Sequence, residues 1–208
     1  MLAAVTVLAL ALALVVLLGR PATSSPPGGS SAGVSPAQER AASASGFDGA
    51  IIPGGLPAHD FTLTDQHARA VSLSDYRGQV TILTFLYSTC GPTCILIAQQ
   101  IRGALDELPQ PVPVLIVSAE PAADTPARVS RFLAQVSLTG RVHYLTGRLQ
   151  ALQPIWRAYK VVPGTSGRGA FDRFASVFVL DRSGRERVVF QPEQLTPEGL
   201  AHDIRKLS

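Results

Sequence analysis

The stretch from Thr81 to Leu108, TILTFLYSTCGPTCILIAQQIRGALDEL, contains the only two cysteines of the 208-residue chain. The run over residues 80–87 is β-branched and aromatic, which predicts a buried strand. From the second cysteine onward, apolar residues recur at helical spacing, at Cys94, Ile97, Ile101, Leu105 and Leu108. The sequence therefore predicts that both thiols lie where a strand passes into a helix.

This junction favours thiol chemistry, because the first turn of a helix has unpaired N–H groups and a partial positive charge that stabilise a thiolate. Residues four apart on a helix have Cα atoms roughly 6 Å apart, which a disulfide can span. Cys90 and Cys94 are therefore candidate catalytic residues of a reversible disulfide. They are equally candidate ligands of one soft metal ion such as Cu(I). The alternative is a pair of buried structural cysteines.

The N-terminal third of the chain differs in composition from the rest. Residues 1–19, MLAAVTVLALALALVVLLG, carry no charge, and as a helix they would be roughly 28 Å long, close to the ~30 Å core of a bilayer. They lack the basic start and the good cleavage site of a signal segment, so we expect a membrane anchor, with a signal segment as the alternative. Residues 20–57 are rich in Pro, Gly, Ser and Ala and predict a flexible linker. Residues 58–208 have a common domain size.

Within residues 58–208 strands and helices alternate. An N-terminal β-hairpin is expected from residues 61–64 and 70–73. Further strands are expected at residues 80–87, 112–118, 142–145, 174–180 and 186–190, and helices at 94–108, 126–136, 149–159 and 196–207. This order predicts an α/β fold of the thioredoxin-like type, with a mixed central sheet flanked by helices.

Several short motifs follow one another in an order that resembles a known family. They are FTLTDQ (61–66), VSLSDYRG (71–78), TFLYSTCGPTC (84–94), SAEPAADTP (118–126), HYLTG (143–147), IWRAY (155–159) and FVLDRSG (178–184). Together they resemble the Sco/SenC family, accessory proteins of cytochrome c oxidase assembly. The resemblance implies a membrane-tethered domain outside the cytoplasm that serves the binuclear copper site of the oxidase as a copper carrier, as a thiol reductase, or as both.

One position departs from the family pattern. The family binds copper through the two cysteine sulfurs and a distant histidine, and the position that corresponds to this histidine, counted back from Asp181, is Arg173. Arginine is always cationic and has no lone pair for a metal. Near the sulfurs it would repel copper and stabilise a thiolate, which favours thiol–disulfide exchange. Copper remains a weakened expectation as cofactor, because two thiolates alone can hold Cu(I).

The four histidines, His59, His67, His143 and His202, are expected to be ordinary surface or boundary residues, because none of them belongs to a histidine and cysteine spacing typical of a metal site. The net charge of +3 at pH 7 is mild, and arginines scattered without interleaved aromatic residues argue against nucleic acid as a partner.

These observations lead us to expect a membrane-tethered, extracytoplasmic Sco-like protein at the cell membrane. It would use the Cys90/Cys94 dithiol for exchange in maturation of the oxidase copper site, with Cys90 as the more exposed, attacking thiol. The expected partners are the copper-binding subunit of the oxidase or another thiol protein, and the membrane through the N-terminal helix. The alternatives are a metallochaperone that carries Cu(I) on the same cysteines, a general thiol–disulfide oxidoreductase unrelated to copper, and a non-catalytic interaction domain.

Overall fold

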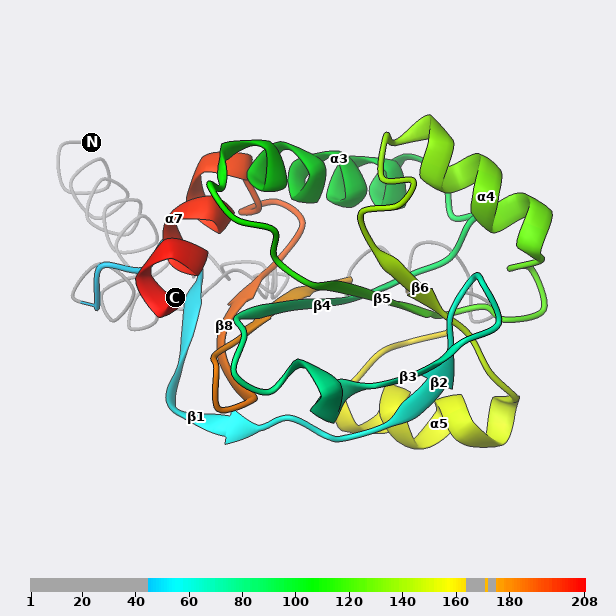
Figure 1. The fold of residues 1–208 in the computed structure, drawn as a ribbon, viewed down its shortest axis with the longest axis horizontal. Helices are drawn as coiled ribbons and strands as arrows, with labels where there is room; N and C mark the ends of the chain where they lie inside the picture. Colours follow the sequence, from blue (N-terminus) through cyan, green and yellow to red (C-terminus); the bar gives the residue numbers. More distant parts are fainter. Residues whose placement is uncertain (1–44, 164–170, 172–174) are drawn as a thin grey trace, which may run out of the picture. The chain divides into compact units, whose positions relative to one another are not determined.

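The buried strand predicted before the cysteines is the centre of the structure, a computed structural model that describes residues 45–163, 171 and 175–208. It is β4, Thr81–Leu86, and all six of its residues are buried. A strand whose side chains are buried on both faces of a sheet needs helices or loops above and below it. β4 accordingly lies inside a six-stranded sheet of order β1-β8-β7-β4-β5-β6 (Figure 1).

The sheet is mixed, as predicted. β4 runs parallel to β5, Val114–Ser118, and β5 runs parallel to β6, His143–Leu145. On the other side, β7, Val177–Leu180, is antiparallel to β4 and forms a hairpin with β8, Arg185–Phe190. The carboxyl end of β4 therefore lies inside the sheet, beside the carboxyl end of β5.

The first strand, β1, was not predicted. Residues Ala50–Pro57 pair antiparallel with β8, with an irregular register between Ile51 and Leu56. The prediction of a flexible linker as far as residue 57 is therefore corrected for this part. Most of these side chains are exposed or half-buried, so the strand forms through backbone pairing at the sheet edge, which leaves no burial pattern in the sequence.

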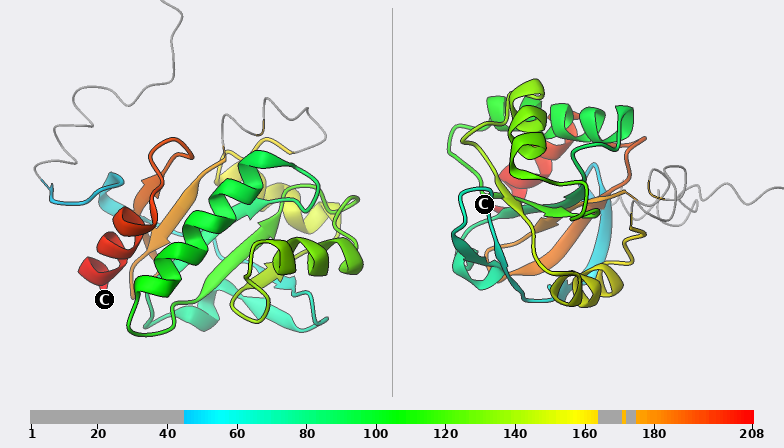
Figure 2. Two further views of the ribbon diagram at one scale, coloured as in Figure 1. Left: turned by 90° about the horizontal axis from the view of Figure 1, so that it is seen from above. Right: turned by 90° about the vertical axis from the view of Figure 1, so that its right-hand side faces the viewer.

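Three helices cover one face of the sheet (Figures 1 and 2): α3, Pro92–Glu107, α4, Pro126–Gln135, and α7, Pro197–Leu207. α4 and α7 each begin with a threonine cap followed by proline. The Thr125 hydroxyl accepts a hydrogen bond from Arg128 N, and the Thr196 hydroxyl accepts one from Gly199 N. α3 and α7 lie side by side above the strands.

The opposite face carries α5, Leu149–Ala158, together with the predicted hairpin of β2, Thr62–Thr64, and β3, Ala70–Ser72. A short 3₁₀ helix, η1, Leu73–Tyr76, leads from the hairpin toward β4. The core thus has two parts: one lies between the sheet and α3, α4 and α7, and contains both cysteines; the other lies between the sheet, α5 and the hairpin. These elements confirm the α/β architecture.

The described residues begin at residue 45. The expected anchor, residues 1–19, and most of the expected linker lie outside them. Within the described part of the chain, no helix has the length and apolarity needed to cross a bilayer.

The hairpin turn contains an ionised carboxylate that makes the stability of the fold depend on pH. The Asp65 carboxylate accepts hydrogen bonds from His67 N at 2.8 Å and from Arg69 N at 2.9 Å, and it forms an ion pair with Arg69 Nη2 at 3.0 Å. Burial raises the pKa of this carboxyl, but these hydrogen bonds and the one with His143 outweigh burial and lower the pKa of Asp65 to about 2. The charged form is therefore the one that the folded state stabilises.

We expect Asp65→Asn to lower the urea midpoint of unfolding at neutral pH. Because the folded pKa is lowered, the contribution of Asp65 is complete above the unfolded value of 3.8 and is lost as the pH falls through about 2. The difference in urea midpoint between Asp65→Asn and the wild type should therefore shrink as the pH falls from 3.8 to about 2. Asp106→Asn, at an exposed carboxylate, is the control. A difference that stays constant down to the acid end would contradict the prediction.

Candidate redox and metal site at Cys90 and Cys94

The two cysteines lie where β4 passes into α3, as predicted. After β4 the chain makes a tight turn in which Cys90 N donates to Tyr87 O at 3.2 Å. Gly91 then caps α3 with φ 88° and ψ −142°, a backbone conformation that is essentially restricted to glycine. Pro92 follows as the first helical residue, where a missing N–H costs nothing. The sequence Cys-Gly-Pro therefore fixes the sharp entry into the helix.

Cys90 and Cys94 form a disulfide, with their Cα atoms 5.9 Å apart. This separation agrees with the value expected from helical spacing and falls in the ordinary range for a disulfide. Cys94 is the third residue of α3, so both sulfurs lie at the amino-terminal end of the helix. The positive end of the helix macrodipole favours a thiolate there once the bond is reduced.

Both cysteines are buried in this oxidised state. Cys90 is 1% exposed and Cys94 is 0% exposed, so neither sulfur is open to solvent while the disulfide is formed, and greater exposure of Cys90 stays a prediction for the reduced pair. The surroundings of the two nevertheless differ. Cys90 lies in the turn between exposed Thr89 and half-buried Gly91, whereas Cys94 lies on the buried face of α3 with Ile97. Uncovering Cys90 requires movement of a turn, while uncovering Cys94 requires movement of a helix.

Sequence reasoning missed a buried carboxylate close to this turn. Asp124, 5% exposed, accepts a hydrogen bond from Ser88 N at 2.7 Å, two residues before Cys90. In the sequence it stands directly before Thr125 and Pro126, a position that a helix start is enough to explain. The signal that could have revealed it is its place in the motif over residues 118–126, which follows the neighbouring parallel strand β5. Adjacent parallel strands end at the same edge of a sheet, so residues that follow them meet.

The segment around Arg173 is described only at its ends. Arg173 itself lies outside the described residues. Phe171 and Ala175 are buried in the same hydrophobic cluster as both cysteines. The Phe171 ring packs edge-on against Tyr87, with ring centroids 4.9 Å apart, and Ala175 N donates to Phe171 O at 2.9 Å. The chain on either side of Arg173 is therefore anchored in the part of the core that contains the disulfide.

His143 lies away from the cysteines. It pairs with Leu115 in the sheet, three residues before Ser118, which pairs with the last residue of β4. At ~3.3 Å per residue this places it about 10 Å back along the strands. Its neighbour Tyr144 contributes to the cysteine side of the core, so the alternation of a strand directs His143 to the opposite face. There its Nδ1 lies 3.4 Å from Asp65 Oδ2.

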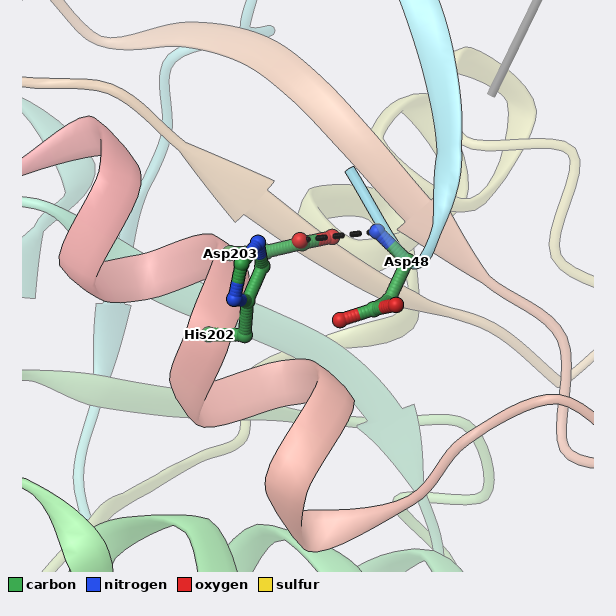
Figure 3. A group of neighbouring side chains, drawn as sticks. All are labelled: Asp48, His202 and Asp203. Carbon is green, nitrogen blue, oxygen red and sulfur yellow. Dashed lines mark hydrogen bonds between the residues drawn. The ribbon is translucent and has the colours of Figure 1, made fainter. Parts of the chain in front are cut away.

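The other histidines also lie outside the cysteine site. His59 and His67 are exposed residues on either side of β2. His202 is on α7, where its Nε2 lies 3.1 Å from Gly46 O. With Asp48 and Asp203 it forms a group whose potential ligand atoms lie within 4.8 Å of one another (Figure 3).

The group of Asp48, His202 and Asp203 has a structural explanation. The two carboxylate oxygens of buried Asp203 accept from Asp48 N and Gly49 N, each at 2.9 Å, and so tie the segment before β1 to α7. Burial raises the pKa of Asp203 despite these hydrogen bonds. Among residues 45–163, 171 and 175–208, this is the only such group of three histidine, cysteine or acidic side chains, and it contains neither cysteine.

The sulfur atoms of Cys90 and Cys94 can bind copper, as an ion to be delivered, only when both cysteines are reduced. A disulfide has no thiolate to offer, whereas the reduced pair presents two soft sulfur ligands, which suit Cu(I) at low coordination. In the described part of the chain no histidine or carboxylate joins the two sulfurs in a cluster of three. The arrangement therefore supports two-electron thiol chemistry directly and copper binding through two ligands.

Comparison with known proteins gives curated relatives of the chain. A protein named "Putative copper-binding protein" from Stutzerimonas stutzeri is 25% identical over 129 residues, which cover 58% of this chain and 61% of that protein. "Protein SCO2 homolog, mitochondrial" from Bos taurus is 29% identical over 109 residues, which cover 49% of this chain and 40% of that protein. The match thus spans less than two thirds of the length of both relatives.

Solved structures share the fold. Apo Sco1 from Thermus thermophilus matches with a TM-score of 0.63 at 22% identity, over 78% of this chain and 97% of that one. Copper-bound ScoI from Bradyrhizobium japonicum matches with a TM-score of 0.55 at 25% identity, over 73% and 99%. BsSco, a Sco-family cytochrome c oxidase assembly protein in which a disulfide switch was identified, matches with a TM-score of 0.62 at 19% identity, over 74% and 94%. These likenesses confirm the thioredoxin-like fold.

The model of the SCO1/SenC family matches residues 54–208, which include β4, the cysteine turn and α3. This match extends over well more than half of the 208 residues. The same residues carry the motifs that resembled the family in the sequence. The chain therefore belongs to the SCO1/SenC family.

Proposed function

We propose that this protein performs thiol–disulfide exchange through Cys90 and Cys94 in maturation of the copper site of cytochrome c oxidase. One observation carries the proposal: the two cysteines are joined in a disulfide at the amino-terminal end of α3. A helix start stabilises the thiolate that exchange requires, and a pair held four residues apart re-forms its disulfide readily. The assembly role is supported by membership of a family that includes oxidase assembly proteins.

The proposed exchange needs no group of this chain other than the two cysteines, and its bonds and electrons balance as follows. The thiolate of reduced Cys90 attacks one sulfur of a partner's disulfide, and the other partner sulfur leaves as a thiolate. The thiolate of Cys94 then attacks Cys90 Sγ and releases the second partner sulfur. The partner gains two electrons and becomes a dithiol, while Cys90 and Cys94 return to the disulfide of this structure. A dithiol reductant outside the protein restores the reduced pair.

The second candidate is a metallochaperone that carries Cu(I) on Cys90 and Cys94. It is favoured by the copper named for two relatives, the protein from Stutzerimonas stutzeri and ScoI from Bradyrhizobium japonicum. Against it stands Arg173 at the position that corresponds to the family histidine, because a guanidinium offers no lone pair to a metal. Exchange is therefore the leading proposal. A general thiol–disulfide oxidoreductase unrelated to copper is the third.

The setting that we propose is the outer side of a cell membrane, with residues 1–19 as anchor and the residues after them as tether. The sequence supports this setting through the length and apolarity of residues 1–19. The proposed partner is the copper-binding subunit of the oxidase, whose cysteines must be reduced before they can bind copper.

Two measurements on the same sample of the full chain test the proposal. The first is the reduction potential of the disulfide, and the second is a Cu(I) titration of the reduced protein against a competing chelator. We expect a potential above about −300 mV, the level below which disulfides behave as structural, together with weak copper binding. Tight copper binding that Cys90→Ser abolishes would favour the metallochaperone. A lower potential without copper binding would contradict both functions.

A further inference from the structure

The turn that carries Cys90 is held by a carboxylate that comes from a different part of the chain. Asp124 follows β5 and precedes α4, and its Oδ1 accepts a hydrogen bond from Ser88 N at 2.7 Å. The rest of the turn has backbone contacts of its own: Cys90 N donates to Tyr87 O, and Ala119 N donates to Leu86 O. The contact from Ser88 to Asp124 therefore joins the residues just before Cys90 to the neighbouring strand.

The second oxygen of Asp124 is also fully engaged. Oδ2 accepts from the Ser118 hydroxyl at 2.6 Å and from the Tyr144 hydroxyl at 2.8 Å. Ser118 ends β5 and Tyr144 lies in β6, so the carboxylate is braced by two strands of the sheet. Trp156 of α5 adds a further contact by donating from Nε1 to Ser118 O at 3.0 Å. The acceptor that meets Ser88 N is thus fixed in space before any exchange takes place.

A fixed acceptor under this turn affects the two oxidation states differently. In the disulfide the covalent bond itself restrains Cys90 relative to Cys94. In the dithiol no such bond remains, and the hydrogen bond of Ser88 restrains the turn that carries Cys90. A restrained turn keeps the Cys90 thiol close to Cys94 and raises the effective concentration of one thiol toward the other. Disulfides form more readily as this effective concentration rises.

We infer that Asp124 is a positioning residue that sets the effective concentration of the Cys90 and Cys94 thiols through the Ser88 amide. The inference rests on the proposed exchange function and goes beyond it, because Asp124 itself touches neither sulfur in the proposed chemistry. Loss of the Ser88 contact makes the disulfide less stable relative to the dithiol, so the protein becomes more oxidising.

Two substitutions at Asp124 test the hydrogen bond to Ser88 N while the charge of the side chain is the same in both. Asp124→Ala and Asp124→Asn both remove the negative charge, but only asparagine keeps an oxygen that can accept from Ser88 N. We expect the effective concentration in Asp124→Ala to be about tenfold lower than in Asp124→Asn, which raises the reduction potential by about 30 mV for a two-electron couple. The readout is the equilibrium of each full-length protein with a glutathione redox buffer. Equal potentials for the two variants would overturn the inference.

Thr84→Val is the matched control for a general weakening of the core. It removes the hydrogen bond from the buried Thr84 hydroxyl to Ser176 O at 2.9 Å and touches neither Asp124 nor its contact with Ser88. We expect its equilibrium constant with glutathione to stay within about twofold of the wild-type value, although the removed hydrogen bond costs stability. A potential that moves as far in Thr84→Val as in Asp124→Ala would show that the shift follows core stability, and it would overturn the inference.

One measurement on the wild type keeps the inference testable if Asp124→Ala does not fold. Asp124 accepts from the Ser88 amide in the oxidised protein, and the inference requires that hydrogen exchange of this amide stays slow after reduction. Exchange at the rate of an exposed amide after reduction would contradict the inference. The wild-type potential separates the two proposals: a cysteine pair that never exchanges with glutathione refutes the proposed function, whereas exchange with an unprotected Ser88 amide refutes only the role of Asp124.

Discussion

Replacing Cys94 with serine is expected to trap Cys90 in a stable mixed disulfide, whereas replacing Cys90 with serine is expected to trap almost nothing. Cys90 lies in a turn beside exposed Thr89, and Cys94 lies on the buried face of α3. A partner sulfur therefore reaches Cys90 by moving a turn and reaches Cys94 only by moving a helix. Without Cys94 the mixed disulfide on Cys90 has no internal thiolate to resolve it.

The measurement is the yield of mixed disulfide after each variant is mixed with a disulfide-containing peptide. We expect at least about tenfold more adduct with Cys94→Ser than with Cys90→Ser, since the accessibility of the remaining protein thiol, which attacks the peptide disulfide, controls the exchange rate. The variants control for each other, because both lose the same five-residue loop closure, worth about 2 kcal/mol in the chain-entropy model. Their stabilities should therefore match. Equal adduct yields would contradict the assignment of Cys90 as the attacking thiol.

The second large effect is expected from restoring a metal ligand at residue 173. Arg173→His should raise the affinity of the reduced protein for Cu(I) by at least about tenfold, because a neutral imidazole can bind copper and a guanidinium cannot. Phe171 and Ala175 flank residue 173 in sequence and lie in the same hydrophobic cluster as the cysteines, which supports a place for residue 173 near the sulfurs. Competition with a Cu(I) chelator measures the change.

Arg131→His is the matched control for this prediction. Arg131 is exposed on α4, and the substitution there adds the same imidazole and removes the same charge. We expect the control to bind copper as the wild type does. If Arg173→His and Arg131→His behave alike, then residue 173 does not stand where the family histidine stands, and the argument against the metallochaperone loses its basis.

Much of the fold could be predicted because its main elements have strong local patterns. β4 is a continuous apolar run, and α3 repeats apolar residues at helical spacing, so both were expected close to their observed positions. α4 and α7 were also expected, over residues 126–136 and 196–207, and in the structure a threonine cap followed by proline begins each of them. β1 was missed because its composition is that of a linker and its strand character comes from pairing with β8.

The position of the two cysteines in the fold was predicted, but the residues that surround them were not. The placement of Cys90 and Cys94 followed from a strand pattern, a helix pattern and their spacing, all of which are local. The burial of Cys90 could not be predicted, because it depends on residues far away in sequence that join the same hydrophobic cluster, such as Phe171. The hydrogen bond between Ser88 and Asp124 could not be predicted for the same reason, since the two residues are 36 positions apart in sequence.

The two outermost strands of the sheet also bear on how the protein behaves at high concentration. β6 has only three residues, and β1 contains Pro53, Gly54, Gly55 and Pro57 and pairs with a shifted register. Short, proline-bearing or irregular rims offer a poor template for strand addition from another molecule. Both rims are therefore protected against edge-to-edge aggregation, so that individual molecules stay free to meet the partner that the proposed exchange requires.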